Sequence, residues 1–234
     1  MTATATNTEA VVATHRPALA AGADALRKFW RPFLLIQSLA VALAVAYRFS
    51  PGVRAACEIV GGWKVSGGLP FAASSGALAG GVLPELAKVL ADRSLAGLRG
   101  RSRTIAFNLV FFACNGVVID RFYALEAVLF GGHANLRTVV TKTAFDQFVF
   151  SPLWLVLITL IFLWRQRGFS WAAVRPALGR GFYRTRVLPL LIPNWLFWIP
   201  MVSIIYALPG PLQFTLFVPA LGAWSLIMVF IAEG

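Results

Sequence analysis

Residues 142–164 read KTAFDQFVFSPLWLVLITLIFLW, a short charged segment followed directly by a long apolar one. Lys142 and Asp146 stand four residues apart, which places both side chains on one side of a helix. Asn135 precedes them and is a favourable N-cap residue, so we predict an amphipathic helix along the membrane interface before a span at residues 147–164. Lysine before aspartate is the weaker order for a surface pair. Two interpretations remain: a local pair, or contacts from each residue to another helix.

The chain as a whole is apolar. Of its 234 residues, 59% are hydrophobic and 13% are charged, and the mean hydropathy is +0.75. A soluble domain of this length carries more polar residues, so we predict an all-α, polytopic integral membrane bundle that has the lipid bilayer as its partner. The net charge of +12 does not indicate a nucleic-acid partner, because the cations lie between apolar segments and form no basic face with stacking aromatic residues.

Six segments are predicted to be transmembrane helices, since roughly 17–25 apolar residues cross a bilayer. Residues 1–30 are polar and rich in Ala and Thr, and we expect a disordered tail there. Residues 31–234 then form a single membrane domain. The predicted spans are residues 33–49, 66–89, 104–123, 147–164, 187–208 and 212–231.

The basic residues predict the orientation of these spans. With six spans, the tail and every second loop share one face of the membrane, and that face holds fifteen of the 21 Lys and Arg residues. Without the first span the basic residues divide almost evenly. The positive-inside rule therefore favours six spans with both termini in the cytoplasm.

Small residues recur every four positions in the second predicted span, at Ala72, Gly76 and Gly80. Such a row lets two helices approach closely. It suits packing within one chain and also a homo-oligomer, and the spacing does not distinguish them.

No catalytic or cofactor signature occurs in the sequence. It has no GxSxG elbow, Walker loop, HExxH or Cys-x-x-Cys motif. His15 and His133 are far apart and have no neighbours at metal-ligand spacing. We therefore expect no enzyme, no metal and no cofactor.

Polar side chains stand at membrane depth in the third predicted span. Asn108 and Asn115 are seven residues apart and share one helical face, which favours interhelical hydrogen bonds over pore lining. Asp120 follows near the end of the span, where a charge within lipid costs roughly 2.5–3.5 kcal/mol. Anchoring beside Arg121 and a functional role explain Asp120 equally well.

Two further segments combine prolines with polar groups. Glu85 follows Pro84, and it either forms a surface pair with Lys88 or attracts cations at the mouth of an aqueous path. Asn194 lies among the prolines of the fifth predicted span, including Pro200. Each proline frees a backbone carbonyl that a neighbouring helix or water must satisfy. Kinked packing and a water-filled crevice are the two interpretations.

Several of these residues form patterns that resemble a known family. Lys142, Asp146, Gln147 and Pro152, arranged K-x-x-x-D-Q-x-x-x-x-P, resemble the signature of the Mpv-seventeen and 22-kilodalton peroxisomal membrane protein family. The segment SGALAGGVLPEL resembles the first helix of that family, with Glu85 where an Asp is usual. The resemblance covers about residues 63–228, and its remaining parts are Gly116, Asp120, Phe122, Tyr123 and Leu125, followed by Asn194, Trp195, Trp198, Pro200, Tyr206, Pro209 and Trp224.

The resemblance implies an all-helical membrane protein with weakly selective pore activity. Residues 33–49 precede the matched region and look like an addition, and Ile199 is inserted between Trp198 and Pro200. We expect a channel for ions or small metabolites, with a non-conducting membrane scaffold as the alternative. Since residues 1–30 show no clear transit peptide, we expect a bacterial inner membrane, with a mitochondrial or plastid membrane as the alternative.

Overall fold

The chain folds into a bundle of helices. The computed structural model describes residues 18–92 and 101–233, and no strand occurs within these ranges. This confirms the prediction of an all-α polytopic bundle. The elements in chain order are α1 (Ala18–Phe49), α2 (Pro51–Gly76), the π-helical turn η2 (Ala77–Val82), α3 (Leu83–Asp92), α5 (Ser102–Phe130), α6 (Leu136–Phe145), the π-helical turn η3 (Asp146–Phe150), α7 (Ser151–Gln166), α8 (Trp171–Val174), the 3-10 turn η4 (Arg175–Ala177), the π-helical turn η5 (Tyr183–Val187), α9 (Leu188–Tyr206) and α10 (Gly210–Glu233).

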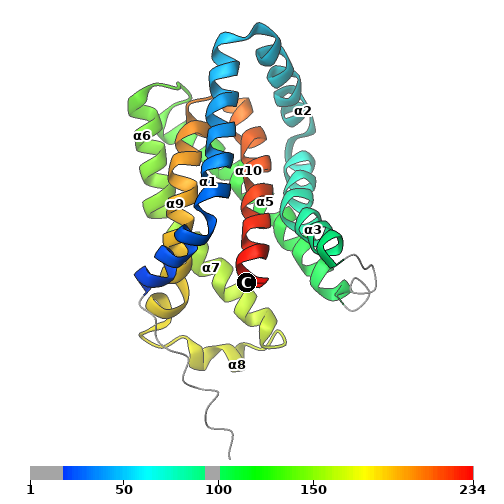
Figure 1. The fold of residues 1–234 in the computed structure, drawn as a ribbon, viewed down its shortest axis with the longest axis vertical. Helices are drawn as coiled ribbons and strands as arrows, with labels where there is room; N and C mark the ends of the chain where they lie inside the picture. Colours follow the sequence, from blue (N-terminus) through cyan, green and yellow to red (C-terminus); the bar gives the residue numbers. More distant parts are fainter. Residues whose placement is uncertain (1–17, 93–100, 234) are drawn as a thin grey trace, which may run out of the picture.

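The helices run alternately up and down the long axis of the bundle (Figure 1). The chain rises in α1, descends through α2 and α3, rises in α5, descends through α6 and α7, rises in α9 and descends in α10. We call the end that contains α8 the lower end and the opposite end the upper end. The start of α1 and the end of α10 both lie toward the lower end, which is the relation that an even number of passages requires.

Five helices of the described part are long and apolar enough to cross a membrane: Trp30–Phe49, Ser102–Phe130, Leu136–Gln166, Tyr183–Tyr206 and Gly210–Ile227. These correspond to five of the six predicted spans, and the protein is a multi-pass membrane protein. The remaining predicted span, residues 66–89, is not among these five. This segment is helical, but its serines and glycines, with Glu85 and Lys88, make it more polar than the other five.

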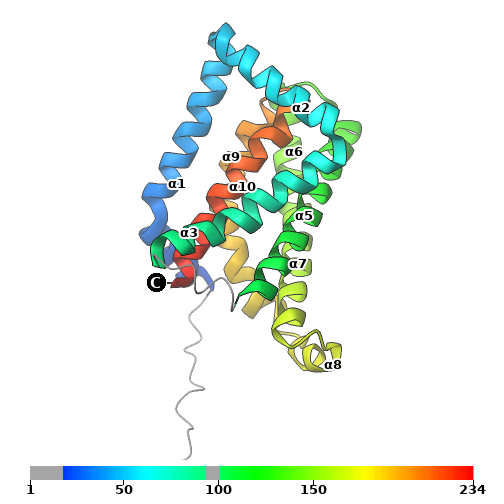
Figure 2. The ribbon, with the colours of Figure 1, turned by 90° about the vertical axis from the view of Figure 1, so that its right-hand side faces the viewer.

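The more polar segment nevertheless descends beside α5 (Figure 2). It changes direction at Gly68, whose φ of 50° lies in the left-handed region that favours glycine. Below this bend the predicted row of small residues faces α5. Ala72, Gly76 and Gly80 are all buried, and a β-carbon on Gly76 would lie 3.0 Å from the Cα atom of Gly116. The row thus packs two helices of one chain together.

The first helix begins earlier than predicted. Residues 1–17 of the expected disordered tail lie outside the described residues, whereas residues 18–30 form the start of α1. The reason is the alanine-rich sequence after Ala18, because alanine has the highest helix propensity. Farther along, α1 packs on α9: the amide of Gln37 donates to the carbonyl oxygen of Phe197 at 2.7 Å, and the rings of Phe33 and Phe197 meet edge to face.

The predicted interfacial helix is instead the upper part of a span. The amide oxygen of Asn135 accepts from the backbone N–H of Thr138 at 2.9 Å, so the predicted cap is confirmed. However, α6 continues through η3 into α7 without a break, and it runs beside α9 (Figure 1). The prediction of an interfacial helix was therefore wrong. Lys142 is only 1% exposed. Its charged side chain is directed into the bundle and does not face a membrane surface.

Each of the three π-helical turns ends two residues before a proline. These prolines are Pro84, Pro152 and Pro189. Proline lacks an N–H group, and its ring crowds the carbonyl group one turn earlier, so a wider turn relieves the crowding. In a π-helical turn each carbonyl oxygen accepts from the N–H five residues later. For Gln147 in η3 that residue is Pro152, which has no N–H. The indole N–H of Trp195 donates to the carbonyl oxygen of Gln147 instead, at 2.7 Å.

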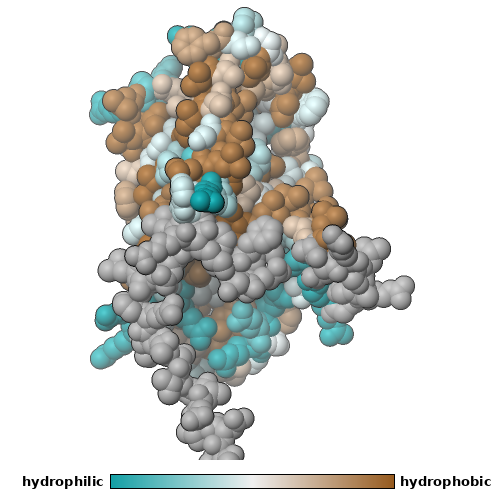
Figure 3. Space-filling model, viewed as in Figure 1, coloured by the Kyte–Doolittle hydropathy of each residue, from teal (hydrophilic) through white to brown (hydrophobic). Residues whose placement is uncertain are grey.

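The outer surface is suited to lipid. Figure 3 shows apolar residues over much of the upper part of one face and hydrophilic residues gathered toward the lower end. Several large apolar side chains are exposed, among them Leu35, Leu39, Val110 and Leu153. Because water disfavours such a surface, it supports the assignment of a multi-pass membrane protein.

Candidate functional site

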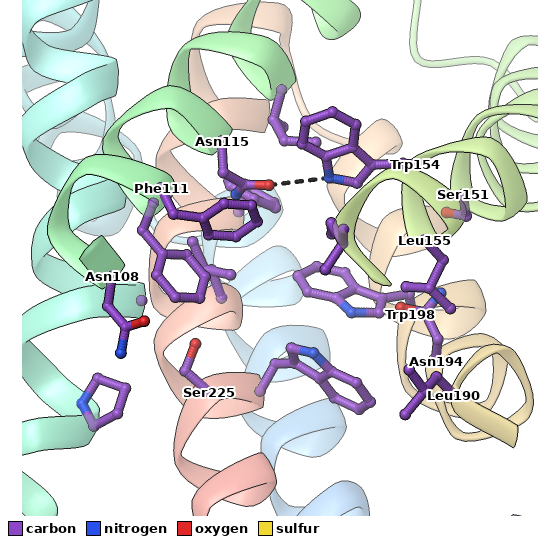
Figure 4. A pocket seen from close by; sticks show the side chains of 18 of the residues that line it. Asn108, Phe111, Asn115, Ser151, Trp154, Leu155, Leu190, Asn194, Trp198 and Ser225 are labelled. Carbon is purple, nitrogen blue, oxygen red and sulfur yellow. Dashed lines mark hydrogen bonds between the residues drawn. The ribbon is translucent and has the colours of Figure 1, made fainter. Parts of the chain in front are cut away.

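A pocket of about 600 Å³ follows α5 through the bundle. Its lining includes Arg101 near the start of α5 and Tyr123 near the end, and at 1.5 Å per residue these positions are roughly 33 Å apart. Helices α7, α9 and α10 supply most of the other walls (Figure 4). The predicted polar-path residues that line it are Glu85, Asn108, Asn115, Asp146, Gln147, Asn194 and Trp198.

The lower part of the pocket carries an ion-pair network. Glu85 is 4% exposed, and its carboxylate lies 3.0 Å from the ammonium of Lys88 and 3.8 Å from the guanidinium of Arg101. All three residues line the pocket. Glu85 thus forms the i, i+3 pair that the sequence predicted, and it also lines a pocket.

The middle of the pocket holds amides and hydroxyls among aromatic rings. The side-chain oxygen of Asn115 accepts from the indole N–H of Trp154 at 3.1 Å, which links α5 to α7 (Figure 4). The side-chain oxygen of Asn108 and the hydroxyl of Ser225 have no hydrogen-bond partner among the described residues. Asn115 therefore joins helices, whereas Asn108 presents an unsatisfied acceptor to the pocket.

Asp146 contacts two hydroxyl groups at the end of the pocket that is nearest the upper end of the bundle, which we call the inner end of the pocket. Tyr206 donates to Oδ2 of Asp146 at 2.8 Å, and Ser151 donates to Oδ1 at 3.3 Å. The side-chain oxygen of its neighbour Gln147 has no partner among the described residues. The π-helical turn η3 positions both Asp146 and Gln147 toward the pocket.

Lys142 and Asp146 do not form a local ion pair in the described structure. Instead, each reaches α9, and they meet at the same tyrosine. The hydroxyl of Tyr206 bonds Asp146, while the ammonium of Lys142 lies 5.6 Å from the centre of its ring, within the range of a cation–π contact. Of the two interpretations from the sequence, the structure shows the one with contacts to another helix.

Glu126 was not predicted as a site residue from the sequence. This residue is fully buried in α5, one turn after Tyr123, whose ring contacts Tyr206, and it interacts electrostatically with Asp146 and Lys142. Neither of its carboxylate oxygens has a hydrogen-bond partner in the described part of the chain. Its signal in the sequence was a single acidic residue in the apolar run FYALEAVLF, residues 122–130.

Four predicted site residues lie outside the pocket lining. Asp120 is 2% exposed and pairs with Lys64 at 2.7 Å and with Arg121 at 2.8 Å, as the anchoring interpretation predicted. Pro152 follows the π-helical turn η3. Pro200 is exposed on α9, and Lys142 lies beside Tyr206.

The groups that line the pocket are able to bind a small polar solute. Within residues 18–92 and 101–233, no group of three or more His, Cys, Asp or Glu side chains is placed to hold a metal ion. The pocket offers amide oxygens, hydroxyls and the carboxylates of Glu85 and Asp146 along aromatic walls. Such groups form hydrogen bonds with small polar solutes.

Comparisons with protein-family models, with curated proteins and with solved structures found no match to this chain.

Proposed function

We propose that this multi-pass membrane protein is a pore-like protein for ions or small metabolites, here in a conformation that is closed at the upper end. One observation carries the proposal. Seven polar or aromatic residues that were predicted from the sequence as path candidates come from separate segments of the chain and line one pocket, which follows α5 over roughly 33 Å. The resemblance to the Mpv-seventeen and 22-kilodalton peroxisomal membrane protein family supports the same function.

Aromatic rings support a closed upper end. The ring of Phe122 stacks on Phe150 with centroids 3.8 Å apart, and the ring of Tyr123 meets Tyr206 edge to face at 5.5 Å. These rings lie beside the inner end of the pocket, where Tyr123 and Phe150 belong to its lining. Passage through the bundle therefore requires these rings to move.

The charges along the pocket favour weak selectivity. Two basic residues and one acidic residue line its lower part, whereas Asp146 lies at the inner end. Opposite signs at the two ends give neither anions nor cations an advantage along the whole path. The charged side chains at each end would instead bind and slow ions of the opposite sign.

A non-conducting scaffold is the second candidate. It is favoured by polar groups that join helices directly: Asn115 with Trp154, and Asp146 with Tyr206. In a scaffold these bonds stabilise the bundle, and the pocket passes nothing. Purified protein in planar bilayers separates the candidates, because a pore raises the conductance above that of empty bilayers and a scaffold does not.

Cysteine modification provides a sharper test of the path. In a chain whose native cysteines are replaced by alanine, Asn108→Cys introduces a thiol in the pocket, and Val110→Cys introduces one on the exposed side of the same helix. We expect a charged thiol reagent to reduce conductance through the Asn108→Cys protein and to leave the Val110→Cys protein unchanged. Equal responses, or no conductance from verified folded protein, would refute the proposed pore.

A further inference from the structure

Three ionisable residues are buried in the upper part of the bundle, and the proposed pore does not require them. Glu126 is 0% exposed, Lys142 is 1% exposed and Asp146 is 6% exposed. They come from α5, α6 and η3, and two tyrosines join them: Tyr206 contacts Asp146 and Lys142, and the ring of Tyr123 contacts that of Tyr206. Two carboxyl groups and one ammonium leave one negative charge in excess. Because an uncompensated buried charge is costly, this cluster needs one more positive charge.

Tyr206 contacts one carboxyl group of the cluster directly, and its ring meets Tyr123, which lies one turn before Glu126 in α5. Its hydroxyl donates its single proton to Oδ2 of Asp146 at 2.8 Å. Glu126 interacts electrostatically with Tyr206, and neither of its oxygens has a hydrogen-bond partner among the described residues. A tyrosine oxygen that has already donated its proton can still accept one. Glu126 can therefore hydrogen-bond Tyr206 only as a carboxylic acid, with Glu126 as the donor.

Only one carboxyl group of the cluster faces the pocket. Asp146 lines the pocket together with Ser151, whereas Glu126 does not. Ser151 lies 3.3 Å from Oδ1 of Asp146, so a polar contact leads from the cluster into the pocket. Glu126 lies four residues before the end of α5, which is about 6 Å along the helix axis. The three groups Glu126, Tyr206 and Asp146 thus bridge the region between the upper end and the pocket.

We propose that Glu126, Tyr206 and Asp146 form a proton relay that holds one exchangeable proton. In a transfer, the O–H bond of the Glu126 acid breaks and its proton binds the Tyr206 oxygen. The original Tyr206 O–H bond breaks as its proton binds Oδ2 of Asp146. Glu126 becomes a carboxylate and Asp146 an acid, so one positive charge moves toward the pocket and no electrons are exchanged.

The surroundings of the relay are suited to a mobile proton. The ammonium of Lys142 lies over the Tyr206 ring and offsets one negative charge wherever the proton resides. The Tyr123 ring contacts Tyr206 edge to face and belongs to the pocket lining. The relay requires Asp146 to face the pocket, but it does not require the pocket to pass a larger solute.

Proton flux into vesicles tests the relay. The full chain is reconstituted in liposomes that contain a pH-sensitive dye, and a potassium gradient with valinomycin drives protons inward. We expect Tyr206→Phe, which keeps the ring and removes the hydroxyl, to lower the protein-dependent flux at least tenfold. Tyr183→Phe is the matched control, because Tyr183 is 44% exposed. A Tyr206→Phe flux equal to that of the unmodified protein would overturn the relay.

Infrared spectroscopy tests the bound proton without any transport. Difference spectra of the purified protein between acidic and basic buffer should contain the carbonyl stretch of a buried carboxylic acid, and Glu126→Gln should remove it. Folding of this variant is checked by its thermal unfolding. Two results would assign the missing positive charge to a metal cation and overturn the relay. One is absence of the band, and the other is a vesicle flux that stops when choline replaces the external cations and returns when sodium is added. The band present without solute conductance would refute the pore alone.

Discussion

Gly116→Ala tests how closely the small-residue row of α2 approaches α5. A β-carbon on Gly116 would collide with the carbonyl group of Ala72 and lie 3.3 Å from the Cα atom of Gly76. These are backbone atoms, so a whole helix must shift to make room. Overpacking of this kind costs roughly 1–3 kcal/mol. In Gly62→Ala, by contrast, the new methyl group meets nothing within 4 Å.

The two variants form a matched pair. Each replaces a helical glycine, and each gains about 0.5–1 kcal/mol of helix propensity. This gain cancels when they are compared, so the free energy of unfolding of Gly116→Ala should be about 1–3 kcal/mol lower than that of Gly62→Ala. Reversible unfolding in detergent micelles, followed by circular dichroism, measures the difference. If Gly116→Ala is as stable as Gly62→Ala, the two helices do not approach as closely as described.

Three further predictions concern the buried charges, the π-helical turn and the orientation. Lys142→Met should destabilise the protein by about 3–5 kcal/mol, far more than Arg137→Met on the exposed side of the same helix, and adding Asp146→Asn, which removes the negative charge left without a counter-charge, should restore about 0.5–3 kcal/mol; additive losses in the double variant would contradict the coupling of Lys142 and Asp146. Trp195→Phe should cost about 1–3 kcal/mol in the same unfolding assay, because it removes the N–H that satisfies the carbonyl group in η3; unchanged stability would show that the bond contributes nothing. Single cysteines at positions 137 and 175 should react from opposite sides of the membrane with an impermeant thiol reagent, with Arg175→Cys on the cytoplasmic side; labelling of both from one side would contradict the passage of α6 and α7 through the bilayer.

Periodicity and composition predicted much of the fold. Long apolar runs mark helices of membrane length, and the row of Ala72, Gly76 and Gly80 indicated a close helix contact that the structure places against α5. The seven-residue spacing of Asn108 and Asn115 predicted a shared face, and both line the pocket. Each of these inferences depends only on the geometry of one helix, and this geometry is present in the sequence.

The rest depends on contacts between helices that are far apart in the sequence. The sequence could not show that Lys142 and Asp146 both meet Tyr206, because 60 residues separate Asp146 from its partner. Glu126 was not predicted for the same reason, since no charged residue lies one turn away from it in the sequence. The interfacial prediction failed because an amphipathic pattern looks the same when its polar side faces water and when it faces buried carboxyl groups.

The π-helical turn before Pro152 also changes the directions in which the side chains of the long helix point. A π-helical turn accommodates one extra residue, and each residue advances a helix by about 100°. The segments above and below η3 are therefore rotated relative to each other by about that angle. A single α-helical wheel drawn over residues 136–166 misplaces one half of the side chains. The rotation allows the upper half to direct Lys142 toward α9 while the lower half directs Trp154 and Leu155 toward the pocket.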